Sequence, residues 1–303
     1  MFHDFNYPAV LTAAHRAEWQ LDDVMPSDAT LDFSRPFLPE ALAGTLGLSG
    51  LSSSERLTLN QIRGHEYLSI FGLVEEFILP FLLDHVREQD GSDDHRIRAL
   101  LQFASEEAKH IHLFRRFQTA FTKSFTVPCA VIGPADAIAA KILAHDPLSV
   151  ALTILHIEWM TQIHYVDSVR DDGGLDPLFA SLLRHHWMEE AQHAKLDTLI
   201  VETLASARDQ ASADKAVEGY LEIIAFLDGG LKAQTELNLS VFEQATGHML
   251  EGENRAMFLT HQHQALRRTY LGSGMTHARF LATVEAISPA GRARIDAVTP
   301  NFC

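Results

Sequence analysis

The chain of 303 residues has only two cysteines, Cys129 and Cys303, and no C-x-x-C pair. Their scarcity excludes a cysteine-based redox centre and fits a reducing cytoplasm, where we expect the protein to reside. Basic residues are also few, since 24 Lys and Arg stand against 40 Asp and Glu and give a formal net charge of −16. Nucleic-acid binding needs a basic face that neutralises phosphates, so we expect no nucleic-acid partner.

Long apolar runs and flexible linkers are missing as well. No apolar stretch reaches about 18 residues, and the N-terminal MFHDFNYPAV lacks the basic and apolar regions of a signal peptide. We therefore expect neither a membrane span nor secretion. No Gly/Pro/Ser-rich segment divides the chain, and 47% of its residues are hydrophobic. These features predict a single domain, residues 1–303, with a large core.

Helical periodicity dominates the sequence, and no alternating pattern of useful length indicates a strand. Residues 1–54 are predicted to be irregular with short helical pieces. Long helices are predicted over roughly 55–88, 94–124, 146–171, 176–208, 214–246, 250–271 and 275–297. The breaks between them carry turn chemistry at QDGSDD, VIGPAD, DDGGLDP and GSGM. The fold class is therefore all-α, with a core bundle over about 55–208 and packing helices over about 214–297.

One pattern of metal-binding side chains occurs twice: a glutamate in an apolar helical stretch is followed 32 residues later by an E-x-x-H. The six residues are Glu75, Glu107, His110, Glu158, Glu190 and His193. The i, i+3 spacing places carboxylate and imidazole on one helix face. A ferritin-like four-helix bundle holds two metal ions with this set of residues, and mixed carboxylate and imidazole ligands favour iron or manganese. The sequence therefore predicts a ferritin-like bundle with a two-metal centre.

Two further positions bear on the ligand set. Glu75 has a neighbour of the same type, Glu76, but Glu75 shares its helix stripe with large apolar residues, so we predict Glu75 as the ligand and keep Glu76 as the alternative. His186 stands four residues before Glu190 and falls on the same stripe. We predict His186 as a third nitrogen ligand, the alternative being a structural histidine beside the core.

The full pattern, Glu, E-x-x-H, Glu and H-x-x-x-E-x-x-H, resembles that of the p-aminobenzoate N-oxygenase family of diiron arylamine oxygenases. The resemblance covers roughly residues 60–200 and includes GSDD at 91–94 and the segment SEEAKH. It implies a homodimeric enzyme that uses two iron ions and O2 to oxidise a small-molecule substrate, by N-oxygenation of an amine or hydroxylation of a C–H bond. The sequence has no flavin, nucleotide or iron–sulfur motif, so electrons would come from an external reductase or ferredoxin.

The chain departs from that family at several positions. The acidic residue before each E-x-x-H, usually Asp in the family, is Glu106 or Glu189 here; the resemblance implies that each binds a ligand imidazole, the alternative being a solvent-facing side chain. Ile70 stands where the aminobenzoate enzymes have an arginine suited to a substrate carboxylate, which weakens the case for aminobenzoate itself. Tyr67 fits the family, where it would line the substrate pocket, although an aromatic residue at helical spacing also suits a core.

Three other hypotheses stay open from the sequence. A radical-storing protein like the ribonucleotide reductase small subunit would carry a tyrosine one turn after the first metal histidine, where this chain has Phe114. A ferritin-like iron-binding or ferroxidase protein is the second hypothesis, although storage bundles are usually shorter. A bundle without metal is the third, and it would have to accommodate six ligand-type residues in one core.

Overall fold

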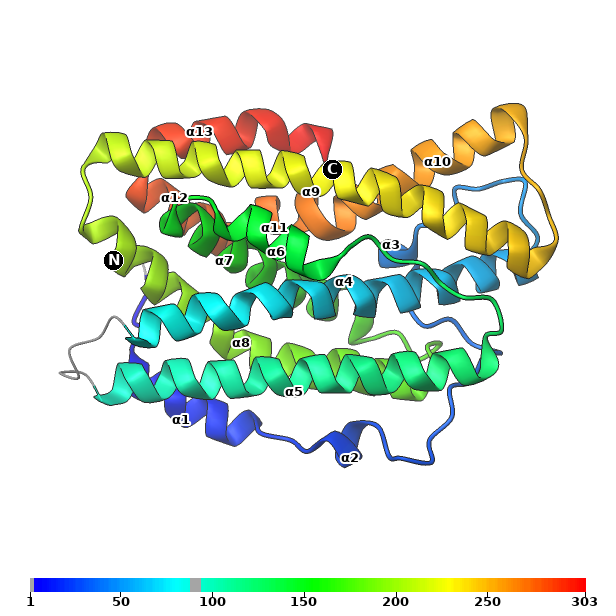
Figure 1. Cartoon of the computed structure of the whole chain (residues 1–303), viewed down its shortest axis with the longest axis horizontal. Coiled ribbons are helices and arrows are strands. Elements are labelled where there is room, and N and C mark those ends of the chain that lie inside the picture. The colour runs from blue at the N-terminus through cyan, green and yellow to red at the C-terminus, as the bar shows by residue number, and fades with distance from the viewer. Residues whose placement is uncertain (1–2, 88–93) are drawn as a thin grey trace.

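The computed structural model describes residues 3–87 and 94–303, and the described residues form helices and no strand (Figure 1). The predicted turn at 89–94 lies outside the described residues, apart from Asp94. The helices are α1 (Tyr7–Ala17), α2 (Leu21–Val24), α3 (Glu40–Ala43), α4 (Ser53–Arg87), α5 (Asp94–Ser124), α6 (Ala135–Leu143), α7 (Pro147–Ile163), α8 (Pro177–Ser206), α9 (Gln210–Thr246), α10 (Gly252–Arg267), α11 (Ser273–Thr276), α12 (Ala278–Ile287) and α13 (Pro289–Val298), with π-helical turns η1 (His164–Val169) and η2 (Arg268–Gly272) and a 3₁₀ turn η3 (Thr299–Asn301).

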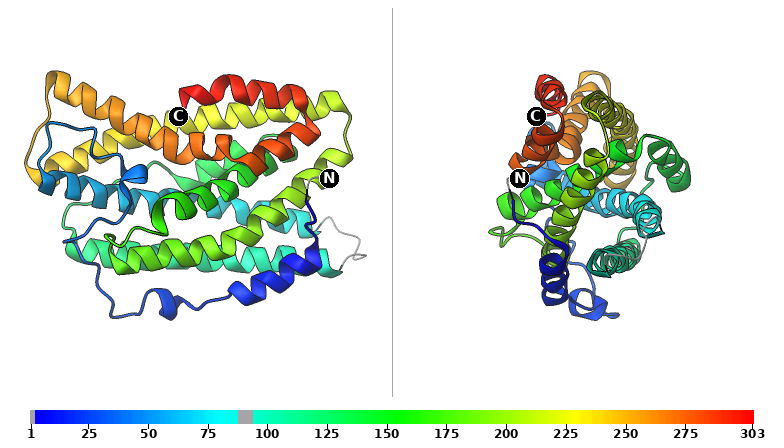
Figure 2. Two further views of the ribbon diagram at one scale, coloured as in Figure 1. Left: turned by 180° about the vertical axis from the view of Figure 1, so that it is seen from behind. Right: turned by 90° about the vertical axis from the view of Figure 1, so that its left-hand side faces the viewer.

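Four long helices, α4, α5, α7 and α8, form the predicted ferritin-like bundle. The closest pairings join α4 to α5 and α7 to α8. Helix α9 packs on both α4 and α7, and Figure 2 shows it with the C-terminal helices on one side of the bundle, opposite α1 and α2. The all-α prediction is confirmed, and the N-terminal segment contains the three short helices α1, α2 and α3.

Helix α7 is buried around its whole circumference, since every residue from Leu148 to Thr161 is buried and the helix lies between α8 and α9. Its N-terminus is fixed by the Asp146 side chain, which accepts a hydrogen bond from the Leu148 backbone N–H. Helix α8 begins in the same way, with Asp176 capping the Phe179 N–H and a proline in the first turn. The predicted break at DDGGLDP is therefore present, and it orients the two ligand-bearing helices.

The predicted organisation of the C-terminal region is partly wrong. The GSGM sequence at 272–275 is helical, because its glycines serve close packing instead of a turn: a Cβ at Gly272 would lie 2.6 Å from the Phe302 carbonyl oxygen. The chain leaves the helix at His277. The predicted helix over 275–297 is divided into α12 and α13, since Ser288 caps a new helix that starts at Pro289. The short helix α6 was not predicted.

Among the described helices, none has both the length and the apolar character of a membrane span.

Candidate metal centre

The structure brings all seven predicted ligands into one buried cluster between the four bundle helices. Helix α4 contributes one residue, α5 two, α7 one and α8 three, and none is more than 3% exposed. The residues are Glu75, Glu107, His110, Glu158, His186, Glu190 and His193.

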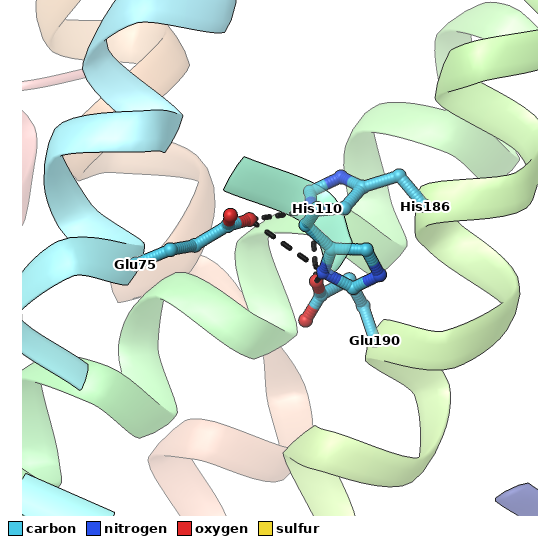
Figure 3. Close-up of side chains that lie close together, drawn as sticks. All are labelled: Glu75, His110, His186 and Glu190. Atoms are coloured by element: carbon cyan, nitrogen blue, oxygen red, sulfur yellow. Dashed lines mark hydrogen bonds and ion pairs between the residues drawn. The ribbon is translucent and has the colours of Figure 1, made fainter. Parts of the chain in front are cut away.

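Two overlapping groups of side chains have ligand atoms within 4.8 Å of one another. The groups are Glu75, His110, His186 and Glu190, shown in Figure 3, and Glu107, His110, Glu190 and His193. In the first group, His186 Nε2 lies 3.1 Å from Glu75 Oε1 and 2.7 Å from Glu190 Oε1. In the second, His193 Nδ1 lies 2.8 Å from Glu107 Oε1 and 3.0 Å from Glu190 Oε2. His110 and Glu190 therefore belong to both groups.

Glu158 stands outside both groups but touches the cluster, because its carboxyl group donates a hydrogen bond to Glu190. The alternative ligand Glu76 faces away from the cluster. Its Oε1 accepts a hydrogen bond from Arg115 Nη2 at 2.8 Å near the surface of the bundle. The geometry thus favours Glu75 over Glu76.

The two glutamates that precede the E-x-x-H motifs bind the ligand histidines in a crossed arrangement. His110 Nε2 lies 2.8 Å from Glu189 Oε2 on α8, and His193 Nε2 lies 2.8 Å from Glu106 Oε2 on α5. Each imidazole donates its Nε2 proton to the glutamate, so its Nδ1 faces the cluster and would bind a metal ion once it is deprotonated. Both glutamates are buried, so the alternative of solvent-facing side chains is wrong.

Side chains missed by the sequence analysis surround this arrangement. Lys109 Nζ bonds Glu189 Oε1 at 2.5 Å and lies 4.0 Å from the centre of the Trp19 ring. Trp19 stacks on the His110 ring at 5.9 Å between centroids, and Phe103 stacks on His193 at 3.9 Å. These aromatic groups shield the cluster from water and hold the imidazoles in place.

Replacing Glu189 by glutamine is expected to weaken metal binding by roughly 10- to 100-fold, because an amide fixes the His110 tautomer less firmly than a carboxylate. Anaerobic titration with Fe(II) measures the change. Glu202→Gln is the matched control, since Glu202 lies on the same helix and contacts another histidine, His3, at 2.9 Å from its Nε2. Equal losses of affinity in both variants would contradict the role of Glu189.

The cluster leaves several buried ligand atoms without a hydrogen-bond partner. The atoms with neither a hydrogen bond nor an ion pair in the cluster are Glu75 Oε2, Glu107 Oε2 and Glu158 Oε2. Buried polar atoms rarely stay unpaired in native proteins. Metal cations would satisfy them, and four carboxylates with three imidazoles match the ligand preference of iron or manganese. The donor set therefore fits a pair of such ions.

Without metal, protons must balance the charge of this cluster. Burial and the neighbouring Glu107 raise the pKa of Glu75 to about 8, and burial raises the pKa of Glu158 well above its usual range. Burial opposes ionisation of Glu190, but the facing histidines hold its pKa well below its usual range. Burial also opposes protonation of His186, yet the Glu190 carboxylate outweighs it and raises the pKa of His186 to about 9. Metal binding would displace these protons.

Asp197 lies one turn beyond His193 on α8 and is fully buried, with neither carboxyl oxygen hydrogen-bonded. Burial raises its pKa well above the usual range for aspartate. Burial thus favours the neutral form of this carboxyl group, which lies behind the cluster and was not among the predicted site residues.

Tyr67, which the family resemblance links to the substrate pocket, packs behind the cluster. Its ring contacts Phe71 at 4.6 Å between centroids, and its hydroxyl donates a hydrogen bond to His164 Nδ1 at 2.9 Å. His164 can accept this bond because its Nε2 donates to the Thr269 carbonyl oxygen. His164 begins η1 and Thr269 lies in η2, so this bond network joins the two π-helical turns.

The sequence matches the family model described as p-aminobenzoate N-oxygenase AurF over residues 11–225. A comparison with curated proteins found no match. Solved structures of R2-like ligand-binding oxidase variants with Mn/Fe cofactors are similar at low identity. A variant reconstituted aerobically has 13% identity and a TM-score of 0.46, covering 95% of this chain and 99% of its own. A variant reconstituted anaerobically has 12% identity and a TM-score of 0.45, covering 88% and 94%.

Proposed function

Because the chain belongs to the p-aminobenzoate N-oxygenase AurF family, whose members are non-haem dimetal oxygenases, we propose that it holds two iron ions and uses O2 to oxidise a small organic substrate. The reaction is N-oxygenation of an amine or hydroxylation of a C–H bond. The proposed iron ligands are the seven residues of the buried cluster, Glu75, Glu107, His110, Glu158, His186, Glu190 and His193.

The observation that carries this proposal is the set of unpaired carboxylate oxygens beside three ligand imidazoles in a core that water does not reach. When bound, the iron pair supplies the redox chemistry that reduces O2 and oxidises the substrate. Residues around the cluster fix the orientation and the tautomer of the ligand histidines. Glu106 accepts a hydrogen bond from His193 Nε2, and Glu189 accepts one from His110 Nε2. The proton of each ring therefore stays on Nε2, and Nδ1 is available to a metal.

Aromatic rings cover the cluster where His186 enters it. The rings of Phe71 and Phe114 lie edge-on to the His186 imidazole, with centroids at 5.4 and 5.2 Å. They exclude water, which strengthens the electrostatic interactions inside and limits side reactions. Phe114 also occupies the position at which a radical-storing protein would have a tyrosine hydroxyl, so this position offers no group for that role.

Electrons are proposed to come from a separate reductase or ferredoxin. The net charge of −16 suits a donor with a basic docking face. A cytoplasmic location is proposed with it, where the free cysteines Cys129 and Cys303 would stay reduced. The homodimer remains a prediction from the family resemblance.

Single-turnover oxidation with ¹⁸O₂ tests the function. Protein loaded anaerobically with Fe(II) is mixed with ¹⁸O₂ and a panel of arylamines and hydrocarbons, and the products are analysed by mass spectrometry. We expect ¹⁸O in an organic product, with a yield proportional to the iron bound. Complete oxidation of the iron without labelled product from any of them would instead indicate a ferroxidase and contradict the proposal.

A further inference from the structure

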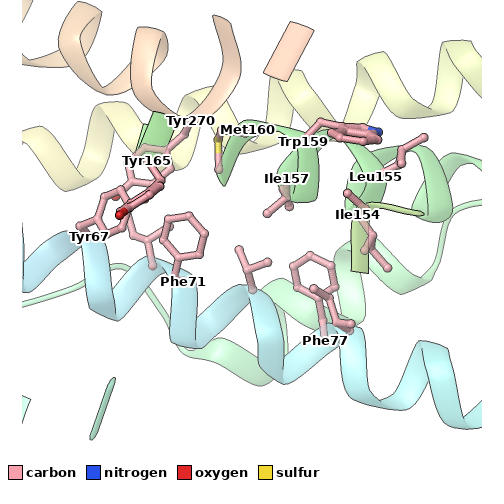
Figure 4. Close-up of a cluster of buried hydrophobic side chains, with 14 of the residues drawn as sticks. Tyr67, Phe71, Phe77, Ile154, Leu155, Ile157, Trp159, Met160, Tyr165 and Tyr270 are labelled. Carbon is pink, nitrogen blue, oxygen red and sulfur yellow. The ribbon is translucent and has the colours of Figure 1, made fainter. Parts of the chain in front are cut away.

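An apolar cavity lies between α4 and α7, directly beside the candidate metal centre. Figure 4 shows Phe71 of α4 and Ile157 and Met160 of α7 around this region. The wall includes Val74 and Ile157, each adjacent in sequence to a proposed ligand, Glu75 or Glu158. Phe71, another wall residue, touches the His186 ring with its own ring. A molecule in the cavity would therefore be separated from the cluster by about one layer of side chains.

The wall of the cavity is almost entirely apolar. Of the twelve described residues that line the cavity, eleven have apolar side chains and the remaining one is Tyr270. The Tyr270 hydroxyl already donates a hydrogen bond to Glu66 Oε1 at 2.9 Å. The buried Arg63 nearby is not a free cation, because it pairs with Glu66 and donates to the Leu42 carbonyl oxygen at 3.0 Å. The wall thus offers nothing that could bind a carboxylate.

A second, more open and polar cavity adjoins the first between α4 and α5, and it includes Arg115 and Gln118. Leu73 and Ile132 line both cavities, so their side chains form the partition between them. Ile132 belongs to the segment between α5 and α6, which is tied to α9 because the Ile132 N–H donates to Gln234 Oε1 at 2.9 Å. Movement of these two side chains would connect the open cavity to the apolar one.

The apolar cavity measures about 50 Å³ in this conformation. A cavity of about 150 Å³ is known to admit benzene, so an aromatic guest requires some side chains to shift. Met160 in the wall is flexible and adapts its shape readily. Leu73 and Ile132 can move toward the open cavity, which has about 350 Å³ of free volume. The two adjoining cavities together therefore leave room for a guest of that size.

We propose that the apolar cavity is the substrate chamber and that it selects an uncharged, hydrophobic substrate, which enters past Leu73 and Ile132. The inference rests on the proposed oxygenase function and names its substrate class: an amine or hydrocarbon that is neutral at physiological pH and has no acid group. A carboxylate in this chamber would lose its hydration without gaining a partner, whereas a methyl group would gain apolar contacts.

Binding of two matched probes to the metal-free protein tests the chamber. p-Toluidine and p-aminobenzoate share the aniline ring and differ only in a methyl or carboxylate group. Isothermal titration calorimetry is expected to give at least tenfold tighter binding of p-toluidine. Equal or tighter binding of p-aminobenzoate, or no binding of either probe, would overturn the proposal.

A pair of variants on α9 locates the binding site. Leu227 lines the cavity, whereas Leu221 is also half-buried on the same helix but lies outside the wall. Leu227→Phe should fill the chamber and weaken p-toluidine binding at least tenfold, while Leu221→Phe should leave it unchanged. Circular dichroism and bound Fe(II) report whether each variant folds and keeps its metal. If the Leu227 variant folds and binds p-toluidine normally, the chamber is elsewhere.

Failure of the chamber and failure of the oxygenase function give different results. If p-toluidine binds and Leu227→Phe blocks it, but the iron-loaded protein forms no ¹⁸O-labelled product from any substrate, the chamber stands and the oxygenase function is wrong. If labelled product forms with equal efficiency in the Leu227→Phe variant, the function stands and the chamber is wrong.

Discussion

Replacing Glu190 by alanine is expected to abolish binding of both metal ions. Glu190 belongs to both groups of ligand atoms: its Oε1 lies 2.7 Å from His186 Nε2, and its Oε2 lies 3.0 Å from His193 Nδ1. It also accepts the hydrogen bond of Glu158, and the facing histidines hold its pKa well below its usual range, so it is the carboxylate that stays ionised. The affinity for Fe(II) should fall by more than about 100-fold, beyond the loss expected for an outer-shell partner.

Metal content after anaerobic loading and gel filtration measures this effect. Two controls accompany it. Glu76→Ala should keep two ions, because Glu76 faces Arg115 outside the cluster. His186→Ala should keep two ions with roughly tenfold lower affinity, since the other candidate ligands remain; unchanged affinity would remove His186 from the ligand set. Two tightly bound ions in Glu190→Ala would contradict the assignment of the centre.

The metal-free protein is expected to lose stability as the pH rises from 6.5 to 9, and metal loading is expected to remove this loss. The pKa of His186 is raised from 6.5 to about 9, so its stabilising contribution is complete below pH 6.5 and disappears as the pH rises through 9. The pKa of Glu75 is raised from 4.5 to about 8, so its contribution falls between pH 4.5 and 8. Glu190 has a lowered pKa and contributes stability above pH 4.5, so it does not change in this window.

The expected loss is on the order of 3 kcal/mol, since one unit of pKa corresponds to about 1.4 kcal/mol. For a chain of 303 residues this loss of unfolding free energy lowers the Tm by roughly 5 °C. Metal replaces the protons and binds more tightly as its ligands deprotonate, so the loaded protein should not show this decrease. Differential scanning calorimetry at both pH values, with and without Mn(II), measures the change. If the Tm of the metal-free protein stays constant or rises with pH, protonation of His186 and Glu75 does not stabilise the cluster.

The four bundle helices and the faces of the seven predicted ligands followed from local spacing. A carboxylate and an imidazole three residues apart share a helix face in any helix, and a glutamate among large apolar residues must face the core. The choice of Glu75 over Glu76 rested on this second argument, and the structure orients the two side chains accordingly.

Features that depend on how helices are rotated against one another were not predictable. The sequence shows a glutamate before each motif, but only the packing of α5 on α8 reveals that Glu106 binds His193 and Glu189 binds His110. Trp19 comes from the irregular N-terminal segment, where no periodicity indicates a direction. The glycines of GSGM were misinterpreted because the same residue serves both turns and close packing, and only the contact with Phe302 distinguishes the two.

X-ray diffraction from crystals of anaerobically Fe(II)-loaded protein, recorded at the iron absorption edge, tests the central claim most directly. We expect two anomalous peaks inside the buried cluster, one bordered by Glu75, His110, His186 and Glu190 and the other by Glu107, His110, Glu190 and His193. A single peak, or iron bound only at surface carboxylates, would contradict a two-metal oxygenase centre.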